Sequence, residues 1–135
     1  MRNRARILIT DDDTGIRDLL RDQLEAAGFE TRVARDGHEA LECMFSFRPD
    51  GMVLDISMPG LDGFGVLRSL KDRAIRLPVL VLSARHDAND VRRAVSLGAR
   101  DYLTKPFTEA QVKARIARLL RAPIPPAPVS GTLFV

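Results

Sequence analysis

The chain has 135 residues, 45% of them hydrophobic and 29% charged, which is typical of one folded domain with a core of its own. Its 21 basic and 18 acidic residues give a formal net charge of +3, too small to indicate nucleic-acid binding. The single cysteine, Cys43, excludes an internal disulfide, and the sequence contains neither a long apolar run nor a secretory signal, so we expect a cytoplasmic protein.

The first predicted strand covers residues 6–10 and stops at three aspartates, Asp11 to Asp13. A helical pattern follows, with apolar side chains at Ile16, Leu19, Leu20, Leu24 and Ala27. Gly28 ends this helix. Residues 30–34 alternate polar and apolar side chains, which indicates a strand nearer the sheet edge.

The second predicted helix has its apolar stripe at Ala40, Leu41, Met44 and Phe45. Pro49 closes it, and residues 51–54 form a third strand that ends at Asp55. Turn-forming residues fill positions 58–63. A third helix then shows apolar side chains at Phe64, Val66, Leu67 and Leu70.

Residues 78–82 are a continuous run of β-branched residues and leucine, typical of a strand covered on both faces. A fourth helix carries apolar residues Val91, Ala94, Val95 and Leu97 and stops at Gly98. Residues 101–103 form a fifth strand, and a last helix shows apolar residues Val112, Ile116, Leu119 and Leu120. Five strands alternating with five helices predict an α/β fold with a doubly wound parallel sheet.

The composition changes at Ala122, because residues 122–131 contain four prolines, which favour an extended linker over a helix. Residues 132–135 are strand-like. We therefore predict a domain at residues 1–121 and a linker at 122–135. We expect this linker to lead to a C-terminal output domain that lies beyond the sequence.

Polar side chains follow the apolar runs at their carboxyl ends: Asp11 and Asp12, then Asp55, Ser83 and Lys105. Ligands of doubly wound sheets bind at this edge, so we expect these side chains to converge. Clustered carboxylates raise one another's pKa unless a cation lies among them, and Mg²⁺ prefers such oxygen ligands. Lys105 and Ser83 would bind oxygens of a transferring phosphoryl group, and a carboxylate can act as its nucleophile.

Four motifs resemble the receiver (CheY-like) domains of two-component response regulators. They are ILITDDD at 7–13, VLDISMPGLDG at 53–63, LSA at 82–84 and DYLTKPF at 101–107. The resemblance covers about residues 5–121 and implies a flavodoxin-like sheet of strand order 2-1-3-4-5. It also implies a phosphohistidine donor, either a histidine kinase or a histidine phosphotransfer protein.

The resemblance assigns roles around the metal. Asp55 resembles the phosphoryl acceptor, and Asp12 the direct Mg²⁺ ligand, with Asp11 acting partly through water. Asp55 and the backbone carbonyl of Ser57 would complete the metal set. Lys105 resembles the phosphate-binding lysine, and its bond to the following proline is typically cis.

The resemblance also implies a switch. Ser83 would move toward the phosphoryl group and Tyr102 would move inward, which remodels the face of the fourth helix, fifth strand and fifth helix. The protein would not be an ordinary enzyme, because it would catalyse only its own phosphorylation and slow hydrolysis.

Residues 98–121 resemble the winged-helix class of response regulators, so we expect transcription control, with DNA contacted only through the missing output domain. In that class the switched face forms a homodimer through ion pairs. Asp101 and Arg115 fit one such pair, whereas Val91 and Gln111 stand where another is usual.

Two alternatives stay open. A stand-alone receiver would act by binding a partner protein. A haloacid dehalogenase-like phosphatase would use an aspartate after the first strand as its nucleophile. Its motif is Asp-x-Asp-x-Thr/Val, but Gly15 occupies the Thr/Val position here, and Asp55 would have no role. We further expect Asp13 and Asp62 to cap helices and Cys43 to be a buried structural thiol. Both His38 and His86 are expected at the surface.

Overall fold

The computed structural model describes residues 4–85 and 87–121, in which strands and helices alternate. The strands are β1 (Arg6–Thr10), β2 (Glu30–Ala34), β3 (Gly51–Asp55), β4 (Val79–Ser83) and β5 (Asp101–Thr104). The helices are α1 (Thr14–Ala26), α2 (Gly37–Ser46), α3 (Gly63–Asp72), α4 (Ala88–Ser96) and α5 (Glu109–Arg121). All strand pairs are parallel in one sheet of order β2-β1-β3-β4-β5, which confirms the predicted fold and places β2 at an edge.

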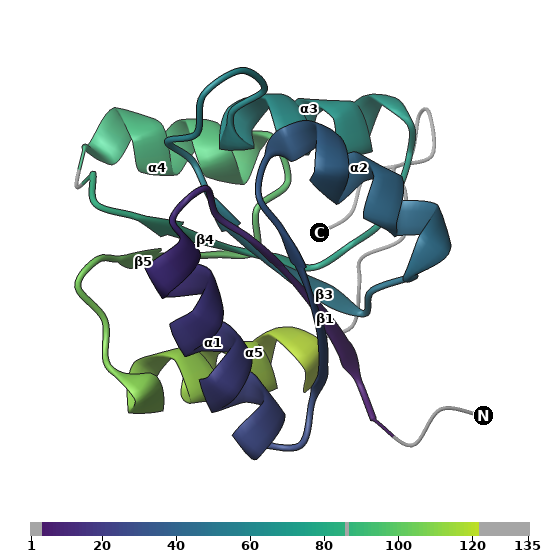
Figure 1. Cartoon of the computed structure of the whole chain (residues 1–135). Coiled ribbons are helices and arrows are strands. Elements are labelled where there is room, and N and C mark those ends of the chain that lie inside the picture. The colour runs from purple at the N-terminus through teal and green to yellow at the C-terminus, as the bar shows by residue number, and fades with distance from the viewer. Residues whose placement is uncertain (1–3, 86, 122–135) are drawn as a thin grey trace.

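Helices cover both faces of the sheet (Figure 1): α1 and α5 lie on one side, and α2, α3 and α4 on the other. Alternate strand side chains supply the two cores, since successive residues of a strand point to opposite faces. The core under α1 and α5 includes Ile7, Ile9, Val53, Leu80 and Leu82. The core under α2, α3 and α4 includes Leu8, Met52, Leu54, Val79 and Val81. Every residue of β3 and β4 is buried, as the continuous apolar run of β4 predicts.

Aspartates begin the helices. The side chain of Asp13 accepts a hydrogen bond from the N–H of Ile16 at 3.1 Å, and Asp62 accepts one from Gly65 at 2.9 Å. Both predicted caps are therefore confirmed. Gly28 and Gly98 follow the C-caps of α1 and α4, and their φ angles of 98° and 106° suit glycine.

Ala27, predicted in the stripe of the first helix, follows the last residue of α1 and is exposed. Three large residues of the predicted apolar stripes are exposed as well: Leu19 (46%), Phe45 (73%) and Val95 (56%). The expectation that they lie inward is wrong, because each is the immediate sequence neighbour of a fully or largely buried residue, Leu20, Met44 or Ala94. One residue corresponds to a rotation of about 100° around a helix, so one member of each pair leaves the inward face.

Several smaller predictions can be compared directly. Cys43 is buried, and burial raises the pKa of its thiol, which fits a structural role. His38 is exposed, as expected, whereas His86 and the predicted linker at 122–135 lie outside the described residues. Within residues 4–85 and 87–121, no helix has the length and apolar character needed to cross a membrane.

Candidate functional site

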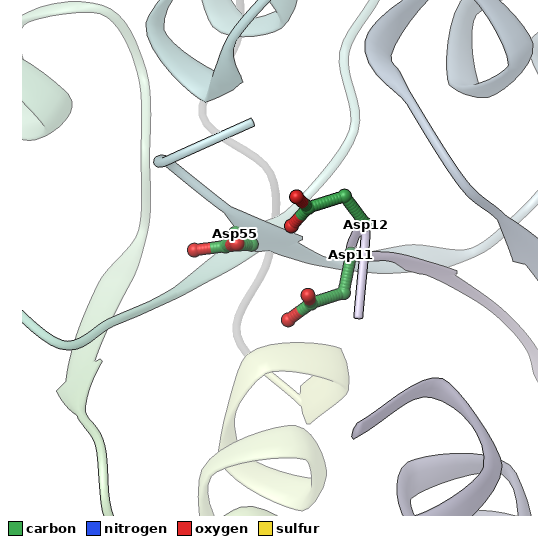
Figure 2. Close-up of side chains that lie close together, drawn as sticks. All are labelled: Asp11, Asp12 and Asp55. Carbon is green, nitrogen blue, oxygen red and sulfur yellow. The ribbon is translucent and has the colours of Figure 1, made fainter. Parts of the chain in front are cut away.

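Three carboxylates meet at the carboxyl edge of the sheet. Strands β1 and β3 are neighbours, with Thr10 opposite Leu54, so the residues that follow them emerge at the same level. One carboxylate oxygen from each of Asp11, Asp12 and Asp55 lies within 4.8 Å of the other two. Figure 2 shows the three side chains gathered at one point, from the ends of two strands. The predicted convergence of these acids is therefore present.

Local hydrogen bonds hold the aspartates that follow β1. The N–H of Asp11 donates to the carbonyl of Ala34 at 3.2 Å, and Asp11 Oδ1 accepts from the N–H of Asp13 at 2.9 Å. Arg17 Nη1 donates to the Asp11 carbonyl oxygen at 2.7 Å, which ties the first turns of α1 to the end of the strand. Asp11 is buried and Asp12 is exposed, so the cluster is open to solvent on the side of Asp12.

Lys105 supplies an ammonium group to this cluster. Its Nζ lies 3.0 Å from Asp11 Oδ2 and 3.7 Å from Asp55 Oδ1. The N–H of Lys105 donates to the carbonyl of Ser83 at 2.7 Å, and the bond from Lys105 to Pro106 is cis, as predicted. One ammonium against three carboxylates leaves the cluster negatively charged when all are ionised. These all-oxygen donors are of the kind that a hard divalent cation prefers.

Burial and neighbouring charges both act on the carboxyl group of Asp55. Burial and the charge of Asp11 raise the pKa of Asp55 from its ordinary 3.8 to about 6. The ammonium of Lys105 and the N–H of Ser57 act in the opposite direction. Asp55 is therefore a carboxylate whose charge is disfavoured by its surroundings, and a cation beside it would relieve this. Such perturbed groups are typical of functional sites.

Gly63 explains how closely α3 approaches the end of β3. A Cβ atom added at Gly63 would lie 2.6 Å from the carbonyl oxygen of Asp55 and 2.6 Å from the Cα of Ile56. Only glycine permits this approach. This role of Gly63 was not predicted, although the residue lies within the motif at 53–63.

Ser83 and Tyr102 are connected through one residue of the loop after β4. Ser83 is fully buried, and its Oγ accepts a hydrogen bond from the N–H of Arg85 at 3.0 Å. The hydroxyl of Tyr102 donates to the Arg85 carbonyl at 3.1 Å. Arg85 Nε also lies 2.8 Å from Asp90 Oδ2. This ion pair was not predicted, because no local sequence pattern links the two residues.

Asp101 forms two ion pairs within the chain. Its Oδ1 lies 2.7 Å from Arg115 Nη1, and its Oδ2 lies 2.7 Å from Arg118 Nη2. The sequence predicted Asp101 and Arg115 as a pair between two subunits of a homodimer; the pair seen here lies within one chain, so the intersubunit pair stays a prediction. The contact with Arg118 was not predicted. Together the two pairs fasten α5 to the beginning of β5.

Comparison with known proteins gives the same family from sequence and from structure. The family described as response regulator receiver domain matches residues 7–117. Response regulator MprA of Mycolicibacterium vanbaalenii is 44% identical over 121 residues, which are 90% of this chain and 52% of that protein. Response regulator MprA of Mycobacterium ulcerans is 46% identical over 117 residues, 87% of this chain and 50% of that protein. The chain thus spans about half the length of these relatives.

Solved structures share the fold. The receiver domain of the Francisella response regulator 1452 superimposes with a TM-score of 0.82 at 35% identity, covering 87% of this chain and 97% of that one. The Vibrio cholerae chemotaxis protein CheY4 gives a TM-score of 0.82 at 28% identity, covering 87% of this chain and 99% of that one.

Proposed function

Because the chain belongs to the response regulator receiver domain family, we propose that it accepts a phosphoryl group on Asp55 from the phosphohistidine of a histidine kinase or histidine phosphotransfer protein. The observation that carries this proposal is the gathering of Asp11, Asp12 and Asp55 within 4.8 Å, with Lys105 beside them. A carboxylate oxygen of Asp55 bonds to phosphorus while the phosphorus–nitrogen bond breaks, which gives an acyl phosphate. The imidazole leaves with the bonding electron pair and takes up a proton.

Asp11, Asp12 and Asp55 would hold Mg²⁺, together with the backbone carbonyl of Ser57. The fit rests on the donor set, because clustered carboxylates of net negative charge suit a hard cation. When bound, Mg²⁺ supplies positive charge that stabilises the oxygens of the transferring group. The raised pKa of Asp55 supports a cation here, since the acid would otherwise resist ionisation.

The remaining residues of the site position the phosphoryl group. Lys105 exchanges its contact with Asp55 for one with a phosphoryl oxygen, which neutralises charge at that oxygen. Ser83 turns its hydroxyl away from the N–H of Arg85 and donates to another oxygen. Tyr102 then gives up its hydrogen bond to Arg85 and moves inward, so the face formed by α4, β5 and α5 changes.

We further propose that this face controls a DNA-binding output domain of the winged-helix class, with a homodimer through α4, β5 and α5. Support comes from the resemblance of residues 98–121 and from relatives of which the matched residues make up only 52% and 50%. The protein would act as a phosphoacceptor with slow self-hydrolysis and not as an enzyme on other substrates. A stand-alone receiver that binds a partner protein is the other possibility, and the coding sequence after Val135 would distinguish the two.

The phosphoacceptor proposal is tested by incubating the protein with acetyl phosphate and Mg²⁺ and measuring intact mass. We expect the mass of one added phosphoryl group in the wild type and none in Asp55→Asn. Asp62→Asn, which changes a helix cap outside the cluster, is the matched control and should still be labelled. Labelling that persists in Asp55→Asn but disappears in Asp11→Asn would instead indicate a phosphatase with an aspartate nucleophile after β1.

A further inference from the structure

Arg85 joins the two switch residues to helix α4. Its N–H donates to Ser83 Oγ at 3.0 Å, and its carbonyl accepts from the hydroxyl of Tyr102 at 3.1 Å. Its guanidinium Nε lies 2.8 Å from Oδ2 of Asp90, in the first turn of α4. One residue of the loop therefore contacts both switch side chains and the helix whose position they are proposed to control.

The carboxylate of Asp90 is largely buried, so losing its ion pair with Arg85 would be energetically unfavourable. Its side chain is 11% exposed, whereas that of Arg85 is 53% exposed. Oδ2 of Asp90 is buried and receives no well-directed hydrogen bond from the described residues, so the charge of Arg85 is its direct compensation. A buried carboxylate that loses its cation is strongly disfavoured. Asp90 is thus held to Arg85, with further help from the positive end of the helix.

The other end of α4 is fastened to a different element. Lys71 Nζ, on α3, donates to the carbonyl of Ser96 at 3.1 Å. The guanidinium of Arg93 lies 4.1 Å from the ring centroid of Phe64, also on α3. The later part of α4 is therefore tied to α3, while its first turn is tied through Asp90 to the loop after β4.

We propose that Asp90 is a positioning residue that transmits the state of Ser83 to the first turn of α4. This inference rests on the proposed function, because it requires Ser83 to turn toward a group on Asp55. When that happens, the contacts of Arg85 with Ser83 and Tyr102 are released, and the ion pair with Asp90 remains. The loop then moves the first turn of α4, and the contacts with α3 hold the later turns.

The test uses beryllofluoride with Mg²⁺ as a stable phosphoryl mimic and follows backbone amide resonances of the whole chain. Amides of Asp12 and Ser57 report occupation of the site, the amide of Val91 reports the first turn of α4, and that of Leu97 reports its end. Asp90→Asn is compared with the wild type. Glu109→Gln is the matched control, because it removes a carboxylate from the first turn of another helix, where it pairs with exposed Lys113.

We expect Asp90→Asn to keep the response of the site amides, while the equilibrium constant for the change at Val91 falls by about two- to thirtyfold, the range of coupling effects at intermediate residues. The response at Leu97 should be small in every variant. The control should behave as the wild type.

An unchanged Val91 response in Asp90→Asn would overturn the inference, and so would loss of the site response in that variant, since Asp90 would then act on the site itself. Asp90→Asn could lose its native amide dispersion because the charge of Arg85 is left unpaired. In that case the double variant Arg85→Gln/Asp90→Asn, which replaces both charged side chains with neutral amides, tests the same contact. Absence of any Mg²⁺-dependent response at the site amides of the wild type would instead count against the proposed function.

Discussion

Asp55 shows how one residue is prepared for its proposed role. It is 5% exposed, and its carboxylate faces both repulsion from Asp11 and attraction from Lys105. Burial and repulsion prevail, so the pKa rises to about 6. At neutral pH the group is still largely ionised and able to act as a nucleophile, but its charge costs folding free energy. This cost is the basis for a pH-dependent prediction.

In metal-free solution, Asp55→Asn should become more stable relative to the wild type as the pH rises. Between the ordinary pKa of 3.8 and the folded value of about 6, the unfolded chain releases a proton that the folded chain retains, so the free energy of unfolding of the wild type falls across this window. Above the folded pKa, the ionised carboxylate of Asp55 lowers the free energy of unfolding of the wild type by its full amount, about 2–3 kcal/mol. Urea unfolding in chelator from pH 4 to 8 measures it.

Asp62→Asn is the control for this titration, because asparagine also caps helices well and Asp62 lies outside the cluster. The difference in free energy of unfolding between Asp62→Asn and the wild type should not change with pH in the way expected for Asp55→Asn. A wild type that gains stability relative to Asp55→Asn across that window would contradict the prediction.

Lys105 would compete with a cation held by the three carboxylates, which gives a second prediction. Replacing Lys105 with methionine removes the ammonium that pairs with Asp11 and Asp55, so Mg²⁺ should bind more tightly, by about 1 kcal/mol or roughly fivefold in Kd. Phosphorylation by acetyl phosphate should nevertheless slow, because a phosphoryl oxygen loses its partner. Titration calorimetry and intact-mass kinetics measure the two effects.

Lys113→Met is the matched control for Lys105→Met, because Lys113 forms an exposed ion pair with Glu109 on α5. Neither Mg²⁺ affinity nor labelling should change in it. Weaker Mg²⁺ binding in Lys105→Met would show that the lysine organises the carboxylates more than it competes with the cation.

At the scale of elements, the close approach of α3 to β3 fixes the backbone at Asp55. Gly63 begins α3, and the space for its missing Cβ is occupied by backbone atoms of Asp55 and Ile56. Backbone cannot move aside as the end of a flexible side chain can. A side chain at Gly63 must therefore shift either the helix or the end of the strand.

Gly63→Ala should destabilise the protein by about 1–3 kcal/mol, the usual cost of overpacking, and should slow labelling of Asp55. Gly15→Ala makes the same change in the first turn of α1, where the nearest atom to the new Cβ is a side-chain oxygen of Asp13 at 3.2 Å. It should cost less than Gly63→Ala, because alanine favours a helix over glycine and the close atom belongs to a side chain, the capping carboxylate of Asp13, and not to the backbone. Equal stability of the two variants in urea unfolding would refute the packing argument.

At the scale of the whole molecule, Tyr102 offers a direct report of switching. The chain has one tyrosine and no tryptophan, so fluorotyrosine labelling gives a single aromatic resonance, from Tyr102. Its hydroxyl contacts the Arg85 carbonyl, a contact that the proposed movement of Ser83 would release. The site and the face formed by α4, β5 and α5 should thus change together.

Beryllofluoride with Mg²⁺ should shift the fluorotyrosine resonance of the wild type. In Ser83→Ala the site amides should still respond, but the shift of Tyr102 should shrink, because no hydroxyl is left to turn toward the mimic. Fluorine and amide resonances recorded in one titration measure both. A full Tyr102 shift in Ser83→Ala would show that the aromatic residue moves independently of Ser83.

Much of the fold and of the site could be predicted from the sequence. Apolar periodicity gave the strands and helices, and the aspartates at strand ends indicated the acidic cluster. The helix caps at Asp13 and Asp62 followed from residue type. These properties depend on a few residues that are neighbours in the sequence, so a short segment is enough to predict them.

Other properties were decided only by the tertiary structure. Which of the neighbours Met44 and Phe45 faces the core depends on how α2 packs on the sheet, and the need for Gly63 depends on how close α3 lies to β3. The contact of Lys105 with Asp11 joins residues 94 positions apart, and the pair of Arg85 with Asp90 depends on the path of a loop. Such contacts depend on distances between packed elements, and the periodicity of a short segment contains no information about those distances. The raised pKa of Asp55 also depends on tertiary structure, because it comes from burial and from the charge of Asp11 at the end of another strand.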